Sequence, residues 1–416
     1  MNALPPLRVL AQDLPRLRIA DPGRAARDAL AVLDLGPRVR GRRIAVTAGS
    51  RGIRDIAPVL RAAVAHLREL GADPVVVAAM GSHGGATAEG QERVLAHLGL
   101  TAEALGAPIS TAMDTVVIGH TPEGLAVHCD RVAAACDGVL VANRIKPHTA
   151  FDEPFGSGLL KMLAVGLGKA PGAALVHRQG AARLAAVITA VARVHLDRGT
   201  VIGGLAVVEN AYDETAIIEA VPPAQLVERE LALFQQARAM MPRLPVDELD
   251  VLVVDRVGKD YAGTGMDPYV IGRRRLRGLP EPVSPRITRI AALRLSAGSE
   301  GNAQGIGLAD VTTRRLVDAI DRRTTYTNTM TTTFLERAFI PLVFDSDREA
   351  IAAALATSEA PDPARARVAR IPNTLHLGRL LVSEAVADAL AGRPGITVGP
   401  EVPWAFDPDG WLVDLV

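Results

Sequence analysis

The sequence predicts an α/β protein of two domains, the second smaller than the first. Short apolar runs alternate with helical patterns along the first half of the chain, which is typical of a mainly parallel sheet covered by helices. The second half repeats this alternation less regularly. At 416 residues the chain also exceeds the roughly 250–300 residues at which a single hydrophobic core stops growing. We therefore expect two cores.

The first two strand-helix units follow each other directly. The apolar run 43–48 predicts a strand, and the apolar stripe between residues 56 and 67 predicts the helix after it. The run 74–80 predicts the second strand. After a glycine-rich turn, Thr87 is placed to cap the next helix, with Glu89 in its first turn. In a parallel sheet, the turns after both strands lie at the same edge.

The rest of the first domain follows the same reasoning. The segment 158–169 is apolar nearly all round, so we expect one buried helix there. Two further helices are expected at 181–196 and 224–239. Additional strands are expected at 115–118, 125–128, 138–142, 203–208 and 216–221.

The segment 240–248 combines prolines with charged residues just before a new strand, so we place the domain boundary there. The predicted domains are 1–245 and 246–416, and we expect the second to close the site carried by the first. The tail with Trp404 and Trp411 is expected to pack back on a domain, with the first domain as a candidate. The elements expected in the second domain are strands at 251–254 and 340–344 and helices at 310–320, 349–357 and 383–390.

Composition narrows the classes of partner. The chain has 46 basic and 46 acidic residues, so it lacks the net positive charge that nucleic-acid or anionic-membrane binding by a whole domain requires. No run of about 18 uncharged apolar residues and no cleavable leader pattern occurs, which favours a cytoplasmic protein. Cys129 and Cys136 are too few for a disulfide framework or a four-thiolate metal site, and we expect free buried thiols. A small-molecule partner fits best.

Three histidines and one arginine lie in turn-like segments of the first half. His83, His148 and His177 stand beside glycine, proline or lysine, whereas the other first-half histidines we weighed lie within helical patterns. Arg51 follows the first strand as His83 follows the second, so both would project over one edge of the sheet. A guanidinium between glycines suits a carboxylate or phosphate, although pairing of Arg51 with Asp55 explains it equally well.

Lys161 is the most unusual charged residue in the sequence because it stands among large apolar neighbours. An ammonium in such surroundings must find a partner, extend to solvent or lose its proton. A neutral lysine is a nucleophile that can hold a cofactor covalently. An ion-paired core lysine is the alternative.

Common catalytic and nucleotide motifs are missing. The first strand is followed by Gly-Ser-Arg-Gly-Ile-Arg, which is neither a P-loop nor a dinucleotide fingerprint. No His-Glu-x-x-His motif and no cysteine pair for a hydrolytic zinc site are present. No serine has the strand-Ser-helix context of a hydrolase. Any chemistry here therefore depends on the turn residues and Lys161.

Five ordered elements together resemble the lactate racemase family, whose members use a nickel-pincer nucleotide. The elements are Gly49–Gly52, Met80–Thr87, Lys146–His148, Ser157–Lys161 and Val176–His177. The resemblance implies a racemase or epimerase acting on a 2-hydroxy acid. For the cofactor, it implies that Lys161 holds the pyridinium ring through a thioamide bond and that His177 ligates nickel. For catalysis, it implies that His83 and His148 are the acid/base pair. For the substrate, it implies that Arg51 binds the carboxylate and that Lys259 is a candidate second carboxylate-binding cation.

The resemblance also implies a mechanism. A histidine takes the hydroxyl proton while hydride leaves the substrate carbon for the cofactor, and return of hydride to the other face of the planar 2-keto acid inverts the centre. Each hydroxyl orientation then needs its own proton acceptor, so two histidines are required. Imidazole, with an ordinary pKa near 6.5, serves both as acid and as base near neutral pH.

Two departures from the family pattern bear on the substrate. The family has an acidic residue three positions before the substrate arginine, where this chain has Ala48, and the segment between His148 and Lys161 is longer. A substrate larger than lactate, such as a sugar acid, therefore stays open. The implied partners are the hydroxy acid and the cofactor-synthesis enzymes; the sequence defines no oligomeric state. The alternatives are a nicotinamide-dependent dehydrogenase, which would not need Lys161, and a non-catalytic protein that binds a phosphorylated or carboxylate ligand.

Overall fold

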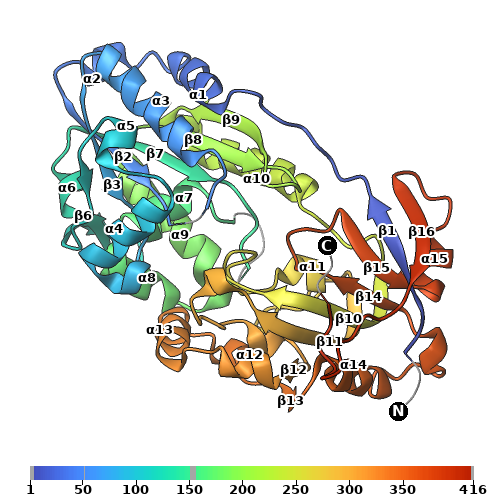
Figure 1. Cartoon of the computed structure of the whole chain (residues 1–416). Coiled ribbons are helices and arrows are strands. Elements are labelled where there is room, and N and C mark those ends of the chain that lie inside the picture. Colours follow the sequence, from blue (N-terminus) through green and yellow to red (C-terminus); the bar gives the residue numbers. More distant parts are fainter. Residues whose placement is uncertain (1–3, 51, 150–155, 414–416) are drawn as a thin grey trace. The chain divides into compact units, whose positions relative to one another are not determined.

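The computed structural model describes residues 4–50, 52–149 and 156–413 (Figure 1). It confirms the α/β prediction and divides the chain into two compact units. One, here called the inserted unit, is Arg16–Met241. The other, the flanking unit, combines Met1–Pro15 with Pro242–Val416. The chain passes from the inserted unit to the flanking unit after Met241, within the proline-rich segment 240–248. It also passes between the units after Pro15, which the sequence did not predict.

A six-stranded sheet forms the centre of the inserted unit. Its strand order is β4 (Ile109–Ser110), β3 (Asp73–Ala78), β2 (Arg43–Ala48), β7 (Gly138–Arg144), β8 (Val201–Glu209) and β9 (Thr215–Val221). All neighbours are parallel except β8 and β9. The strands expected near 115–118 and 125–128 form instead a separate antiparallel pair, β5 (Thr115–His120) and β6 (Ala126–Asp130).

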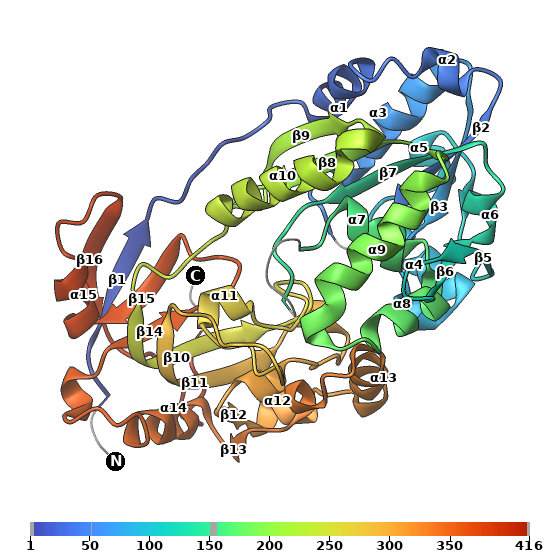
Figure 2. The same ribbon diagram turned by 180° about the vertical axis from the view of Figure 1, so that it is seen from behind.

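Helices cover both faces of this sheet (Figure 2). The apolar stripe of α3 (Ile56–Glu69) packs with α1 (Pro22–Ala31) and with alternate residues of β2 and β3 in one core. Thr87 caps α4 (Ala88–His97) by accepting from the amide of Gly90 at 3.0 Å, as predicted. On the opposite face lie α7 (Leu159–Lys161) and α10 (Leu226–Met240), close against Gly204 of β8. The remaining helices are α2 (Gly36–Val39), α5 (Ala102–Leu105), α6 (Arg131–Ala134) and α9 (Leu184–Asp197).

The apolar segment predicted as one helix over 158–169 is broken. After α7 the chain forms a π-helical turn at Met162–Gly166, and α8 (Lys169–His177) then begins at an angle of 108° to it. Small residues permit this bend, because a side chain on Gly166 or Gly168 would collide with the carbonyl of Ala79 or Ala164. In the described ranges no single helix is long and apolar enough to cross a membrane, and this bent pair passes such a test only when both parts are joined.

The flanking unit contains an eight-stranded mixed sheet with its own two apolar cores. Its order is β13 (Leu342–Phe344), β12 (Val311–Thr313), β11 (Arg286–Leu295), β10 (Glu248–Val257), β14 (Val368–Ile371), β15 (Arg379–Ser383), β1 (Leu7–Gln12) and β16 (Ile396–Val402). The first five strands are parallel, and the last three are antiparallel to their neighbours. Its helices are α11 (Pro268–Ile271), α12 (Arg314–Asp318), α13 (Arg322–Thr332), α14 (Asp347–Ala356) and α15 (Glu384–Leu390).

Two predictions for the flanking unit were wrong: the extent of one helix, and the first domain as the place where the tail packs. The helix expected at 310–320 begins with a strand, β12, and shrinks to α12, which Thr313 caps. The sequence from Thr324 to Thr333 is rich in threonine, and most of it forms α13, at whose start Asp321 accepts from the amide of Thr324. The tail packs within the flanking unit, where Trp404 donates to the carbonyl of Pro5 at 2.8 Å.

Candidate active site

The candidate site lies at the carboxyl edge of the six-stranded sheet. The strand order reverses between β2 and β7, because β2 leads to β3 on one side and β7 leads to β8 on the other. In open α/β sheets, ligands bind at such a reversal. The backbone pairing of β2 with β7 ends at Val46 and Leu140. Beyond it, the Thr47 hydroxyl bonds both the amide and the carbonyl of Ala142, at 2.8 and 3.1 Å, in place of a backbone ladder.

Lys161 is the last residue of α7 and directly precedes the π-helical turn. Its neighbours Leu160, Met162 and Leu163 are buried, while Lys161 itself is half-buried. π-Helical turns occur frequently at functional sites, because they shift side chains out of helical register. The apolar surroundings expected of Lys161 are therefore present, but the fully buried lysine of this region is Lys169.

His177 is the last residue of α8, and its protonation depends on burial and on one nearby charge. Burial first, and the charge of Lys161 second, lower the pKa of His177 to about 4. The imidazole is therefore neutral at pH 7. Among the described residues, its buried Nδ1 has no hydrogen-bond partner. A neutral imidazole with an unsatisfied nitrogen, close to an amine, has the donor chemistry of a metal ligand.

His83 lies in the exposed turn after β3. Its Nδ1 is 2.8 Å from the carbonyl of Met80, and because a carbonyl only accepts, Nδ1 carries the proton. In the neutral ring, Nε2 therefore holds the lone pair and can act as a base. The turn requires glycine: Gly81 and Gly84 have φ of +60° and +66°, and a Cβ on Gly84 would overlap the backbone of Gly90.

His148 lies on the loop after β7 and is half-buried. That loop is attached to the start of α7 by two contacts. Asn143 donates from Nδ2 to the carbonyl of Gly158 at 2.9 Å, and Lys146 exchanges backbone hydrogen bonds with Ser157 at 2.9 and 2.7 Å. The loop that carries His148 therefore starts beside the helix that carries Lys161.

Close backbone contacts join these elements. A Cβ on Gly81 would lie 3.2 Å from the carbonyl of Val165 and 3.5 Å from the Cβ of Ala173, so the turn with His83 rests on the π-helical turn and on α8. A Cβ on Gly49, after β2, would lie 3.1 Å from Cε of Met162. The elements that carry His83, His148, Lys161 and His177 thus meet at one edge of the sheet.

Two predicted residues remain, Arg51 and Lys259. Arg51 lies outside the described residues. Lys259 lies in the flanking unit, where its Nζ donates to the carbonyl of Gly263 and to the side chains of Gln304 and Asn328, at 2.7, 3.0 and 2.8 Å. Three acceptors match the three N–H donors of an ammonium. This gives Lys259 a structural role in its loop, and its predicted contact with substrate stays a prediction.

Sequence reasoning missed four buried polar residues around the site: Gln91, Asp130, Lys169 and Glu230. Lys169 forms an ion pair with Asp130 at 3.2 Å, and both side chains are fully buried. Glu230 of α10 accepts from the amide of Leu160 at 2.8 Å, at the start of α7. Their signal in the sequence is weak, because each is a single polar residue in a helix or at the end of a strand, and the sequence pattern does not reveal how these elements bend and pack.

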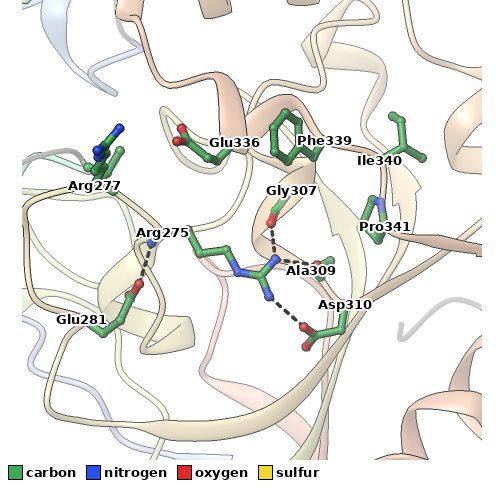
Figure 3. A pocket seen from close by; sticks show the side chains of 11 residues that line it. Arg275, Arg277, Glu281, Gly307, Ala309, Asp310, Glu336, Phe339, Ile340 and Pro341 are labelled. Atoms are coloured by element: carbon green, nitrogen blue, oxygen red, sulfur yellow. Dashed lines mark hydrogen bonds and ion pairs between the residues drawn. The ribbon is translucent and has the colours of Figure 1, made fainter.

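A pocket of about 610 Å³ lies in the flanking unit, and the described residues that line it include none of the predicted site residues (Figure 3). Arg275 lines it and donates to the carbonyls of Gly307 and Ala309 and to Asp310. These bonds fix a loop of the protein. Among the described residues, no group of three or more histidine, cysteine or acidic side chains could hold a metal ion.

The inserted unit thus belongs to the doubly wound α/β class, with polar turn residues gathered at the strand-order reversal. Over both units, the chain has a lactate racemase-like fold. It matches the lactate racemase apoprotein from Thermoanaerobacterium thermosaccharolyticum with a TM-score of 0.52 and 12% identity, over 88% of this chain and 98% of that one. A protein from Thermotoga maritima matches with a TM-score of 0.52 and 14% identity, over 87% and 99% of the two chains. No family model and no curated protein sequence matches.

Proposed function

We propose that this protein is a racemase or epimerase of 2-hydroxy acids that works with a nickel-pincer nucleotide. The observation that carries the proposal is the pairing of Lys161 with His177: a lysine among apolar neighbours lowers the pKa of a buried, neutral imidazole. This pair occurs on a lactate racemase-like fold, in the order and at the spacing that the family resemblance requires. An ordinary nicotinamide dehydrogenase gives no reason for the pair.

The residues present fit the cofactor. Lys161 offers an amine for the thioamide bond, and His177 offers a neutral imidazole whose Nδ1 is otherwise unsatisfied among the described residues. Bound there, the cofactor would supply a reversible acceptor for the hydride of the substrate carbon. The chain has four lysines in all, with arginine as its other cation, which is consistent with lysine being kept where an amine is needed.

His83 and His148 are the proposed acid/base pair. With the proton on Nδ1, His83 presents the lone pair of Nε2 to a substrate hydroxyl and can return the proton later. His148, on the loop after β7, would do the same for the opposite orientation of the hydroxyl. Because the two rings come from turns after different strands, they can serve opposite faces of one carbon.

The substrate carboxylate is assigned to Arg51, with Lys259 as a candidate second cation. A guanidinium can bind a carboxylate through two parallel hydrogen bonds, which would fix the orientation of the acid during proton transfer. The other proposed partners are the enzymes that make the cofactor. The segment between His148 and Lys161 is longer than in the family pattern, so lactate and larger acids are both candidate substrates, and a panel of chiral 2-hydroxy acids and sugar acids would identify the one used.

The covalent bond to Lys161 can be tested by intact mass. Protein made together with the pincer-synthesis enzymes should carry an adduct that is lost in Lys161→Ala, because Lys161 is the amine whose charge acts on His177. Lys146→Ala, a change to the nearest lysine on the preceding loop, should keep the adduct. An unmodified wild-type mass, or an adduct that persists in Lys161→Ala, would contradict the proposal.

The histidine roles can be separated by metal analysis of the loaded protein. His177→Ala should lose nickel together with racemisation. His83→Ala and His148→Ala should keep nickel but lose racemisation by about 10²- to 10⁴-fold, which is the usual contribution of general acid/base catalysis. Nickel content and enantiomer interconversion are the two measurements. Equal nickel loss in all three variants would show that the roles are assigned wrongly.

A further inference from the structure

Lys169 is the most enclosed cation of the inserted unit. Its side chain is fully buried although it stands at the first residue of α8, with a φ of +50° that only a few per cent of non-glycine residues adopt. Its Nζ lies 3.2 Å from Oδ2 of Asp130 and also donates to the carbonyl of Ala78 and, at 3.2 Å, to Oε1 of Gln91. The buried ammonium therefore has one ion-pair partner and two hydrogen-bond acceptors.

Gln91 of α4 links Lys169 to the turn that carries His83 through hydrogen bonds on both sides of its amide. Because an ammonium only donates, Oε1 of Gln91 must face Lys169, and Nε2 must face the other way. Nε2 donates to the carbonyl of Gly81 at 2.9 Å and to that of His83 at 3.3 Å. Gln91 is fully buried, so water cannot replace these bonds easily.

Backbone hydrogen bonds hold part of the turn: the amide of Gly81 donates to the carbonyl of Gly166 at 3.2 Å, and the amide of His83 donates to that of Met80 at 3.1 Å. Buried side chains hold other carbonyls. Between β3 and His83 stand Ala79, Met80, Gly81 and Ser82, and Gly81 has a positive φ. Lys169 holds the carbonyl at the end of β3, and Gln91 holds the carbonyls of Gly81 and His83. The bond that sets the tautomer of His83, from Nδ1 to the carbonyl of Met80, lies between these fixed points.

We propose that Gln91 and Lys169 are positioning residues for His83: oriented by the buried Lys169–Asp130 pair, the amide of Gln91 holds the turn in the shape that keeps the proton of His83 on Nδ1. The consequence for catalysis rests on the proposed function, because only an acid/base role makes the position of Nε2 matter. The tautomer of His83 does not depend on the proposed function.

The test variant is Gln91→Glu, which keeps an acceptor for Lys169 and removes the donor to the turn. Lys169→Met is less useful, because it leaves the buried carboxylate of Asp130 without its partner and is strongly destabilising. In the cofactor-free protein at pH 8, two-bond ¹⁵N–¹H spectra of the imidazoles should show His83 mainly as the Nδ1–H tautomer. In Gln91→Glu this preference should fall, whereas exposed Gln236→Leu on α10 should leave it unchanged.

In the loaded enzyme, Gln91→Glu should lower kcat for racemisation about 10²-fold, as expected when a catalytic group is misplaced by about 1 Å, with little change in KM. A folded variant with a wild-type tautomer and wild-type kcat would overturn the proposal. If Gln91→Glu does not fold, Gln91→Met takes its place under the same two measurements. Should the wild type lack racemase activity, the tautomer measurement still decides the positioning role, while the proposed function fails separately.

Discussion

At the scale of single residues, the effect of the Lys161 charge on His177 can be measured without any cofactor. The pKa of His177 is lowered to about 4 by burial first and by the charge of Lys161 second. The ring is therefore ready to bind a metal throughout the physiological pH range, because its proton has already left. Metal binding by an ordinary histidine weakens as the pH falls through about 6.5, whereas His177 should lose its affinity only near pH 4.

Replacing Lys161 should raise the pKa of His177. Removing a positive charge near the ring makes its protonation less unfavourable, so Lys161→Ala should move the midpoint upward from about 4, while burial keeps it below 6.5. Titration of the imidazole carbon-bound protons by NMR measures this midpoint in the cofactor-free protein. Lys146→Ala serves as the matched change. An unaltered His177 midpoint in Lys161→Ala would mean that the two side chains are not neighbours.

The candidate residues could be found from the sequence because each either stands in a turn or is a charged residue among apolar neighbours. His83, His148 and His177 flank glycine, proline or arginine, and Lys161 is surrounded by leucine and methionine. Lys169 could not be found in this way, because its burial follows from the bend between the π-helical turn and α8, which places its side chain against Asp130 and Gln91. Sequence patterns assume a straight helix and do not reveal such a bend.

At the scale of elements, α10 holds the start of α7 through Glu230. This carboxyl is completely buried, and burial raises its pKa to about 7, against the lowering effect of the amides of Leu160 and Leu159. Its Oε1 has no partner among the described residues and faces Gly158, where any Cβ would lie 2.3 Å away. The helix with Lys161 thus begins on a carboxyl that is half-protonated near neutral pH.

This raised pKa gives stability a definite pH dependence. The folded protein holds the Glu230 proton more tightly than the unfolded chain does, so the stabilisation is complete below about pH 4.5 and is lost as the pH rises to about 7. Relative to Glu230→Gln, the wild type should therefore lose up to about 3 kcal/mol of unfolding free energy over that range. Urea unfolding at pH 5 and pH 8 measures the difference.

Glu228→Gln, at an exposed position of the same helix, is the control for this prediction. Its effect on the unfolding free energy should be small and should not change between pH 5 and pH 8. If Glu230→Gln and the wild type respond to pH in parallel, the carboxyl is ionised in the folded protein at both pH values, and burial does not control its charge.

The regular elements of the inserted unit followed from the sequence because their strands are buried on both faces and read as apolar runs. Strand β2 was predicted with its observed bounds, 43–48. In the flanking unit β11, β14, β15 and β16 were missed, as was β1. Arginines interrupt β11 and β14, and one of them, Arg370, is buried because it pairs with Asp255 at 2.8 Å. Such a pair satisfies a charge inside the sheet, but only the fold brings its two members together.

At the scale of the whole molecule, the chain passes twice between its units, after Pro15 and after Met241. A boundary near residue 245 was readable from prolines and charge, whereas the first crossing was not. The strand β1 is short and lies far in sequence from its partners β15 and β16, which pair with it on both sides. Local patterns cannot reveal a pairing that spans nearly the entire chain.

This interleaving imposes an order on synthesis. When residue 241 leaves the ribosome, every strand of the six-stranded sheet already exists, together with His83, His148, Lys161 and His177. The N-terminal strand at that moment has neither of its hydrogen-bonding neighbours, since both are translated more than 130 residues later. The inserted unit, which carries the proposed chemistry, can thus fold first. Both edges of β1 stay unpaired until β15 and β16 have been synthesised.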